Sequence, residues 1–419
     1  MLHRSSSHLC RRARVAVLVG LAVTSAAIKA DVVTDWDRIA SDVLVANPTA
    51  HPFIHLAMTH VAMFDAVNAI DRGYSVYAIR PQADTAGASA QAAAAAAGYF
   101  LLSSLFPNQQ GVLDSAYTAS LAAIPDGAAE TKGIAVGQEV AAKIIALRAN
   151  DGRNSVVPYI FGSGPGVYQA TPPAFGPPIT PYLRFVTPFG LQRADQFRAY
   201  GPPDLTSAQY AADLNTVREL GAANSQKRTA IQTEIGRFHT EPPFGFWSRN
   251  LRTIAVERNL DTAQSARFFA LVHVALADSL IGCWDSKYYY NFWRPVTAIP
   301  AADTDGNSAT EADAAWLPLA TTPPHPEYPA AHGCGAGAVV EALNGFFGTN
   351  KVRMTFTSTV AGTVPHVFNS TKELSEEIMA ARVYGGMHFP TSARHGVELG
   401  RKVGKWTVKH YFQPVSRKN

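Results

Sequence analysis

Apolar residues recur at helical spacing along most of this chain, and alternating runs typical of strands are few. The spacing predicts helices over residues 52–70, 89–106, 111–123 and 128–148, with a stop signal at Asn150-Asp151-Gly152. The clearest further helix begins at the capping-box sequence Asp261-Thr262-Ala263-Gln264, and we expect Pro295 to end it. The pattern therefore predicts an all-α fold.

Residues 156–205 interrupt the helical pattern. Ten prolines fall between Val156 and Pro203, among aromatic residues such as Tyr159 and Phe161. Loops this long in compact proteins are usually functional or disordered, and the aromatic residues favour an ordered loop that packs over the helices and lines an entrance. The predicted organisation is thus an N-terminal helical part over residues 31–155, this Pro/Gly-rich loop, and a second helical bundle over residues 206–413.

The first 30 residues have the composition of a signal peptide. They hold five basic residues and no acidic one, and a basic stretch precedes an apolar run over residues 15–27 and then small residues. We therefore expect a signal peptide over residues 1–30 and a periplasmic or secreted protein, with a twin-arginine signal at Arg11-Arg12 as the less favoured alternative. The rest has 31 basic and 32 acidic residues, which gives no basic footprint for nucleic acid.

Two further features limit the function classes. The uncharged stretch from Ala86 to Phe106 is mostly alanine with serine and glutamine, so its transfer to lipid would gain little. We expect a buried helix there and no stable membrane insertion. Cys283 and Cys334 remain after the predicted signal peptide, and the sequence leaves open whether they form a disulfide or two buried thiols. The oligomeric state is also open.

The first segment with candidate chemistry is Lys287-Tyr-Tyr-Tyr-Asn-Phe-Trp-Arg294-Pro295. Seven residues make about two helical turns, so Lys287 and Arg294 are expected on nearly one face. Solvated surface charges are the alternative, but the aromatic residues between them favour a partly buried end. Two neighbouring cations repel each other unless an anion lies beside them.

The second segment runs from Pro323 to Gly335 and contains His325 and His332. A proline-stiffened loop leads into a predicted helix over residues 330–343, whose free first-turn amides favour an anion. The small residues Ala330, Ala331 and Gly333 leave room for its close approach. His332 would stand next to that anion, although a single histidine is more often structural.

The third segment is Arg382-Val-Tyr-Gly-Gly-Met-His388-Phe-Pro390. A helix with a capping box at Ser370-Thr371-Lys372-Glu373 is expected to carry Arg382 in its last turn and to end at Gly385-Gly386. His388 follows, before a helix that Thr391 or Ser392 could cap.

Together the three segments supply three cations and two histidines on helix ends and rigid turns. No zinc-type cluster of cysteines or carboxylates accompanies them, and no Gly-rich phosphate loop with Lys-Ser/Thr is present in the sequence. Three cations around one point suit a tetrahedral oxyanion such as phosphate or vanadate.

The order and spacing of these residues resemble the signature of the vanadium-dependent haloperoxidase and type-2 phosphatidic acid phosphatase (PAP2) superfamily. That signature is Lys, six residues, Arg-Pro; then Pro-Ser-Gly-His; then Arg, five residues, His. The first and third parts match at Lys287, Arg294, Arg382 and His388, and the segment from His60 to Asn68 is similar to the bacterial secreted haloperoxidase-like branch. The resemblance implies two four-helix bundles, with the site in the second.

The resemblance also implies roles for the matching residues. His388 would bind vanadate, or attack phosphorus, through a ring nitrogen, and His332 would exchange protons. The oxyanion would be held by these groups: Lys287, Arg294, Arg382 and the backbone amide of Ala331. Ala330 replaces the signature's serine, and Ser392 replaces an acidic residue that orients the second histidine, so Asp65, Asp278 or Asp285 would have to substitute.

The function implied by the resemblance is a vanadium-dependent haloperoxidase that oxidises a halide with hydrogen peroxide. Bromide is expected because His325 matches a position near the halide site that is often histidine in bromide-oxidising members; the alternative is an ordinary loop histidine between prolines. Two alternatives are a secreted acid phosphatase with a phosphohistidine at His388, and a non-catalytic oxyanion-binding relative. Peroxide, halide, an organic acceptor or a phosphate ester are the partners expected, all small molecules.

Overall fold

The computed structural model describes residues 31–48 and 51–415, so the predicted signal peptide over residues 1–30 lies outside them. The described chain is mostly helical, which confirms the all-α prediction. Its α-helices are α1 (Val32–Val45), α2 (Pro52–Asp71), α3 (Ala90–Leu105), α4 (Gln110–Leu121), α5 (Ala128–Leu147), α6 (Ala208–Leu220), α7 (Ala230–Phe238), α8 (Pro243–Glu257), α9 (Thr262–Tyr290), α10 (Pro295–Ala298), α11 (Ala331–Phe347), α12 (Thr371–Tyr384) and α13 (Pro390–His410). Short 3-10 helices are η1 (Pro107–Gln109), η2 (Pro181–Phe185), η3 (Ala194–Phe197) and η4 (Ala302–Thr304), and β1 (Met354–Phe356) pairs antiparallel with β2 (His366–Phe368).

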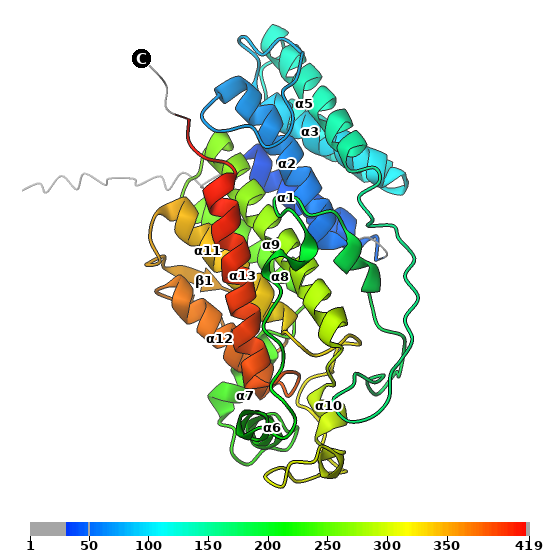
Figure 1. Ribbon diagram of the computed structural model, residues 1–419. Helices are drawn as coiled ribbons and strands as arrows, with labels where there is room; N and C mark the ends of the chain where they lie inside the picture. Colours follow the sequence, from blue (N-terminus) through cyan, green and yellow to red (C-terminus); the bar gives the residue numbers. More distant parts are fainter. Residues whose placement is uncertain (1–30, 49–50, 416–419) are drawn as a thin grey trace, which may run out of the picture.

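Helix α9 runs through the middle of the molecule and contacts both groups of helices (Figure 1). On one side it packs against α2, which leads to α3 and α5; on the other it packs against α11 and α13, which are joined by α12. By length and composition α2 and α9 could each cross a membrane, but their apolar windows are 83% and 94% buried inside the protein, as in core helices. The bundle architecture follows from these buried faces, because each helix covers its apolar surface with another.

Helix α9 begins as predicted and ends earlier than predicted. Asp261 accepts a hydrogen bond from the Gln264 amide at 2.8 Å, and the Gln264 side chain accepts one from the Asp261 amide, which confirms the capping box. The helix ends at Tyr290, because Asn291 adopts the left-handed conformation with φ of 49°. The prediction that Pro295 ends it is wrong. Arg294 therefore lies on an extended residue before α10, outside α9.

The small residues of α11 serve helix packing. A methyl group added to Gly333 would lie 2.7 Å from the carbonyl oxygen of Ala393 on α13, and one added to Gly400 would collide with the Cys334 carbonyl oxygen of α11. The two backbones therefore approach closely, and α11 and α13 form the most extensive helix pair of the described chain. The predicted use of Gly333, to leave room for an anion, is wrong, because α13 takes that space.

The Pro/Gly-rich loop is ordered over the second bundle, as predicted. The Tyr168 amide donates to the Asn291 carbonyl at 2.8 Å, and the Tyr159 hydroxyl donates to the Asn291 side chain at 2.6 Å. Asp278 on α9 accepts hydrogen bonds from three consecutive loop amides, those of residues 189–191, at 2.6–2.9 Å. Through these bonds α9 fixes the path of the loop.

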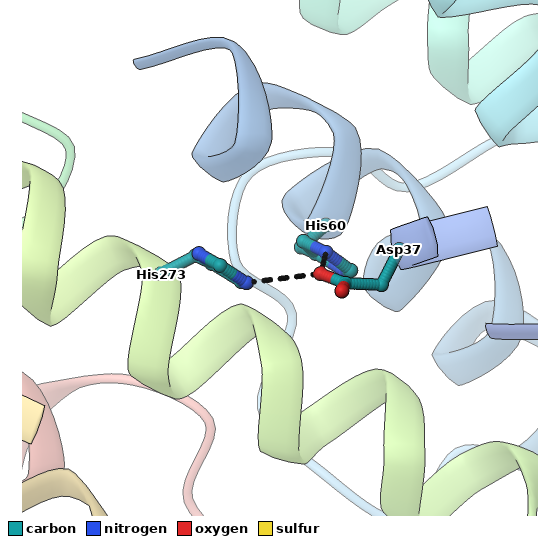
Figure 2. A group of neighbouring side chains, drawn as sticks. All are labelled: Asp37, His60 and His273. Atoms are coloured by element: carbon teal, nitrogen blue, oxygen red, sulfur yellow. Dashed lines mark hydrogen bonds and ion pairs between the residues drawn. The ribbon is translucent and has the colours of Figure 1, made fainter. Parts of the chain in front are cut away.

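A buried carboxylate joins the N-terminal helices to α8 and α9. Asp37 of α1 contacts the Nε2 atoms of His60 on α2, at 2.8 Å, and of His273 on α9, at 3.2 Å (Figure 2). Its other oxygen pairs with Arg252 of α8 at 2.7 Å. Asp37 has no exposed surface. Because a buried charge is costly without partners, these four side chains fix the register of four helices.

We expect Asp37→Ala to lower the free energy of unfolding by about 3–5 kcal/mol, because it leaves Arg252 and two histidines without their shared acceptor. Urea denaturation measures this change. The matched control is Asp42→Ala on the same helix, whose pair with Arg38 is more than half exposed and should cost less than about 1 kcal/mol. Equal losses in the two variants would contradict the assigned role of Asp37.

Candidate active site

Lys287 and Arg294 reach the site from the end of α9 and the start of α10. Lys287 is fully buried, and its ammonium donates to the carbonyls of Pro326 and Glu327, each at 2.9 Å. Arg294, also fully buried, donates from Nε to the His325 carbonyl at 2.9 Å. Both cations are therefore held by the backbone of the loop before α11, which uses only part of their donor capacity.

The guanidinium of Arg294 is the centre of the contacts within the site. One of its terminal nitrogens donates to the Met387 carbonyl at 2.9 Å and lies 3.0 Å from His388 Nε2. The other lies 2.9 Å from His325 Nδ1. Segments that are 31 and 94 residues apart from Arg294 in the sequence are thus brought to one side chain.

Arg382 is in the last turn of α12, as predicted, and is 1% exposed. It donates to the His239 carbonyl at 3.1 Å and contacts the Met387 sulfur at 2.9 Å, while its Nε has no partner in the described structure. The predicted capping box at the start of α12 is only half formed. Ser370 accepts from the Glu373 amide, but the Glu373 carboxylate accepts from the amide of Asn369 instead of Ser370.

His388 is positioned by a carboxylate that the sequence reasoning missed. Its Nδ1 lies 2.9 Å from Glu327 Oε1, which also accepts the Phe389 amide at 3.0 Å. Helix α13 then starts at Pro390 without a side-chain cap, so the predicted caps Thr391 and Ser392 are wrong. Proline needs no cap at this position because it lacks an amide hydrogen.

The three aspartates proposed as substitutes for the family's acidic residue anchor loops instead. Asp65 accepts the amides of residues 77–79, Asp278 those of residues 189–191, and Asp285 pairs with Arg198 at 2.6 Å. None of them contacts His388. Glu327 is the one acidic residue in the segment from Pro323 to Gly335, which carries His325 and His332. No local sequence rule pairs it with His388, which lies 61 positions away.

A cavity of about 430 Å³ opens onto these residues. Five of the predicted site residues line it: His325, Ala331, His332, Arg382 and His388. Lys287 and Arg294 are not part of this lining. Ala331 begins α11, whose start has no side-chain cap. Ile179 and Thr180 of the Pro/Gly-rich loop lie on its wall, together with apolar side chains from α8 and α9 such as Trp247 and Leu280. The loop therefore lines the approach, as predicted.

Comparison with known proteins relates the second half of the chain to a known family. Residues 267–417 match the family model described as the VCPO second helical-bundle domain. The chain is 29% identical to vanadium chloroperoxidase from Curvularia inaequalis, over 42% of this chain and 35% of that protein. Residues 267–417 of this chain thus match the helical domain of the vanadium haloperoxidase family. It spans about a third of the length of that relative.

Two solved structures of bacterial proteins share the fold. A structure described as the first bacterial vanadium-dependent iodoperoxidase has a TM-score of 0.77 at 23% identity and covers 92% of this chain and 98% of that one. A holo-type bacterial vanadium-dependent chloroperoxidase has a TM-score of 0.68 at 16% identity and covers 88% of this chain and 92% of that one. At these identities the likeness establishes the helical-bundle fold.

The hydrogen bonds around His388 decide its protonation. A guanidinium only donates, and an ionised carboxylate only accepts. His388 therefore donates from Nδ1 to Glu327 and turns the lone pair of Nε2 toward Arg294. Burial, and then the positive charge of Arg294, holds the His388 pKa well below its usual range. The ring is neutral, and Nε2 would act as a ligand or base once the Arg294 nitrogen 3.0 Å away turns to another acceptor.

His332 and His325 are neutral for the same reasons. Burial holds the pKa of His332 well below its ordinary value, with Arg382 the next cause, and burial and Arg294 do the same for His325. Burial also lowers the pKa of Lys287 to about 8 and raises that of Glu327 to about 7. Neutral imidazoles beside the cations can accept protons, which suits acid–base work at His332.

The charges of the site fit an oxyanion. Lys287, Arg294 and Arg382 carry three positive charges, and the Glu327 carboxylate interacts with the first two. Above the Glu327 pKa of about 7 the sum is +2 when the histidines are neutral. The unpartnered Nε of Arg382 adds a donor that is buried without an acceptor. Burying uncompensated charge is costly, and a tetrahedral dianion would balance it. Vanadate therefore fits the residues present, and these cations with the Ala331 amide would hold it.

The two cysteines lie beside the site as buried, free thiols. Cys283 contacts the Pro329 carbonyl at 3.7 Å. The sequence left open whether Cys283 and Cys334 form a disulfide or two buried thiols. In the described structure they are two buried thiols.

We expect oxyanion affinity to weaken as the pH rises above about 8, because the Lys287 ammonium, whose pKa burial lowers to about 8, then loses its proton in the free protein. A bound anion raises that pKa again, so affinity should fall by up to about tenfold per pH unit. Isothermal titration with sulfate, which keeps both charges over this range, measures the effect.

The control for this titration is Lys287→Arg, which keeps its charge at every pH used. Ionisation of Glu327 near pH 7 weakens anion binding in the same direction, and this lower step should remain in the variant while the upper step disappears. An upper step of unchanged size in Lys287→Arg would show that another group titrates.

Proposed function

We propose that this protein is a vanadium-dependent haloperoxidase that oxidises a halide with hydrogen peroxide. One observation carries the proposal: a buried site with two uncompensated positive charges lies against the Nε2 lone pair of His388. The family match and the shared fold support it. Vanadate, when bound, would supply the Lewis acid that activates peroxide.

The side chains of the chain would provide binding, orientation and proton transfer. His388, oriented by Glu327, would anchor the vanadate, and the three cations would neutralise its oxygens. His332, neutral and on the cavity wall, would take a proton from incoming peroxide and return it as water leaves. We also propose export to the periplasm or the medium, on the basis of the signal-peptide sequence.

The halide we propose is bromide, with iodide as the alternative. His325 lines the cavity with its ring 5.2 Å from that of Trp284, and Leu276 and Leu280 add apolar surface. A wall of this kind suits a large, weakly hydrated anion better than a small one that holds its water tightly. A solved structure with the same fold is described as an iodoperoxidase, so iodide belongs in the same assay.

The direct test is to add vanadate to one preparation and to measure bromide and iodide peroxidation together with p-nitrophenyl phosphate hydrolysis. We expect halide oxidation, and its loss by at least about a thousandfold in His388→Ala, since the anchor of the cofactor is removed. His410→Ala, at an exposed histidine that ends α13, the helix following His388, is the control and should keep full activity.

Vanadate that binds without halide oxidation would sink the haloperoxidase proposal. Phosphate ester hydrolysis with phosphate trapped on His388 would establish the phosphatase alternative instead, because the same cations suit a phosphoryl group. Binding without either activity would indicate the non-catalytic relative.

A variant at Glu327 distinguishes coordination of vanadate by His388 from simple attraction between opposite charges. We expect Glu327→Gln to weaken vanadate binding by about 10–100-fold, because His388 loses the carboxylate that orients it and raises its basicity. Sulfate, which forms no bond to the ring, should bind at least as tightly, because the net charge of the site rises. Competition calorimetry with both anions measures the contrast.

A second variant tests whether the position of the carboxylate matters. In Glu327→Gln with Ser392→Asp, the carboxylate returns at the position where the family signature has it. We expect partial recovery of vanadate affinity. Equal weakening of vanadate and sulfate binding in Glu327→Gln would instead point to general damage of the site.

A further inference from the structure

A second group of histidines and carboxylates, the His239 cluster, lies beside the site. It consists of His239 at the end of α7, His366 on β2 and Glu377 on α12, with Glu234 of α7 adjoining. Glu377 Oε1 lies 2.9 Å from His239 Nε2 and 2.7 Å from His366 Nδ1. The ligand atoms of these three residues all lie within 4.8 Å of one another.

The two imidazoles of the cluster aim at one point from different directions. The ring of Phe238 stacks on His366 with an interplanar angle of 6° and is inclined by 73° to His239. The two imidazole planes are therefore steeply inclined to each other, while each has a nitrogen directed at the same carboxylate oxygen. In-plane lone pairs that converge in this way can share one small cation.

We propose that His239, His366 and Glu377 form a binding site for a divalent transition-metal ion of the zinc class. Two imidazole nitrogens and one carboxylate oxygen are ligands that zinc prefers. The side chains of His366 and Glu377 are 11% and 18% exposed, which admits a water molecule as fourth ligand.

The outer contacts of the cluster are those of a metal site. Glu234 lies 2.8 Å from Nε2 of His366, the ring nitrogen that would not bind the ion. A carboxylate on the outer nitrogen fixes the tautomer of a metal-binding histidine and raises its basicity. With Glu234 and Glu377 both ionised, the cluster offers two negative charges to a divalent ion.

The Asp37 cluster of Figure 2 provides a contrast within the same protein. It also contains two histidines and a carboxylate close together. Both Nε2 atoms contact Asp37 Oδ1 here too, but the rings of His60 and His273 are stacked in parallel, with an interplanar angle of 4° and centroids 4.5 Å apart, so the two imidazoles lie face to face instead of being steeply inclined to each other. Arg252 already neutralises Asp37. These features indicate a structural ion pair. The Asp37 cluster therefore serves as an internal negative control for metal binding.

An ion in the His239 cluster would act on the oxyanion site through Arg382. The His239 carbonyl accepts a hydrogen bond from Arg382, and Glu377 lies five residues before Arg382 on α12. His239 and His332 also line one small cavity. A bound ion would therefore tie α7, β2 and α12 together around Arg382.

The test is metal binding by the full, tag-free chain without vanadate, so it is independent of the proposed oxidation. After treatment with chelator and dialysis, we expect one Zn²⁺ per chain by mass spectrometry and calorimetry. Co²⁺ should replace it and give the intense visible absorption of a four-coordinate site. Zinc should also raise the melting temperature, because it binds only the folded state.

Two variants locate the ion. Glu377→Gln should abolish stoichiometric binding, and Glu234→Gln, outside the direct ligands, should weaken it by about 10–100-fold while the chain stays folded. His60→Gln in the Asp37 cluster should leave the stoichiometry unchanged. Failure of the unaltered chain to bind one ion, or binding that survives in Glu377→Gln with full affinity, would overturn the proposal.

Discussion

The structure depends on the burial of three cations against one carboxylate. Lys287, Arg294 and Arg382 are each at most 1% exposed, and Glu327 is the acid among them. Such burial is unfavourable unless backbone carbonyls and an anion compensate for the lost water. The loop before α11 supplies the carbonyls, and an oxyanion is the species that would complete the balance. Burial, and then the positive charges beside them, holds the pKa values of His332 and His388 well below the usual range and keeps both rings neutral.

The rest of the fold holds this arrangement rigid. Helix α9 brings Lys287 to the site and, through Asp278, fixes the loop that lines its approach. The close packing of α11 on α13 sets the start of one helix beside the start of the other, which places His332 and His388 on one cavity. Helix α12 carries Arg382 to the same point. Preorganised charges of this kind stabilise an anion more strongly than mobile ones do.

Much of this could be predicted from local sequence. The helical periodicity gave the fold class, the capping box at Asp261 gave the start of α9, and Gly385-Gly386 gave the end of α12. The spacing of the cationic and histidine residues gave the side chains that line or adjoin the cavity. These features are readable because hydrogen bonds and side-chain periodicity within a few residues determine them.

The sequence by itself determined which residues could bind an oxyanion and which segments form helices. Only the tertiary structure decided that Glu327 orients His388, that Arg294 lies beyond the end of α9 and that Gly333 admits α13. Each of these depends on contacts between segments distant along the chain, such as the 61 positions between Glu327 and His388. No local propensity encodes such a pairing, because it is fixed by how the buried faces of several helices pack together.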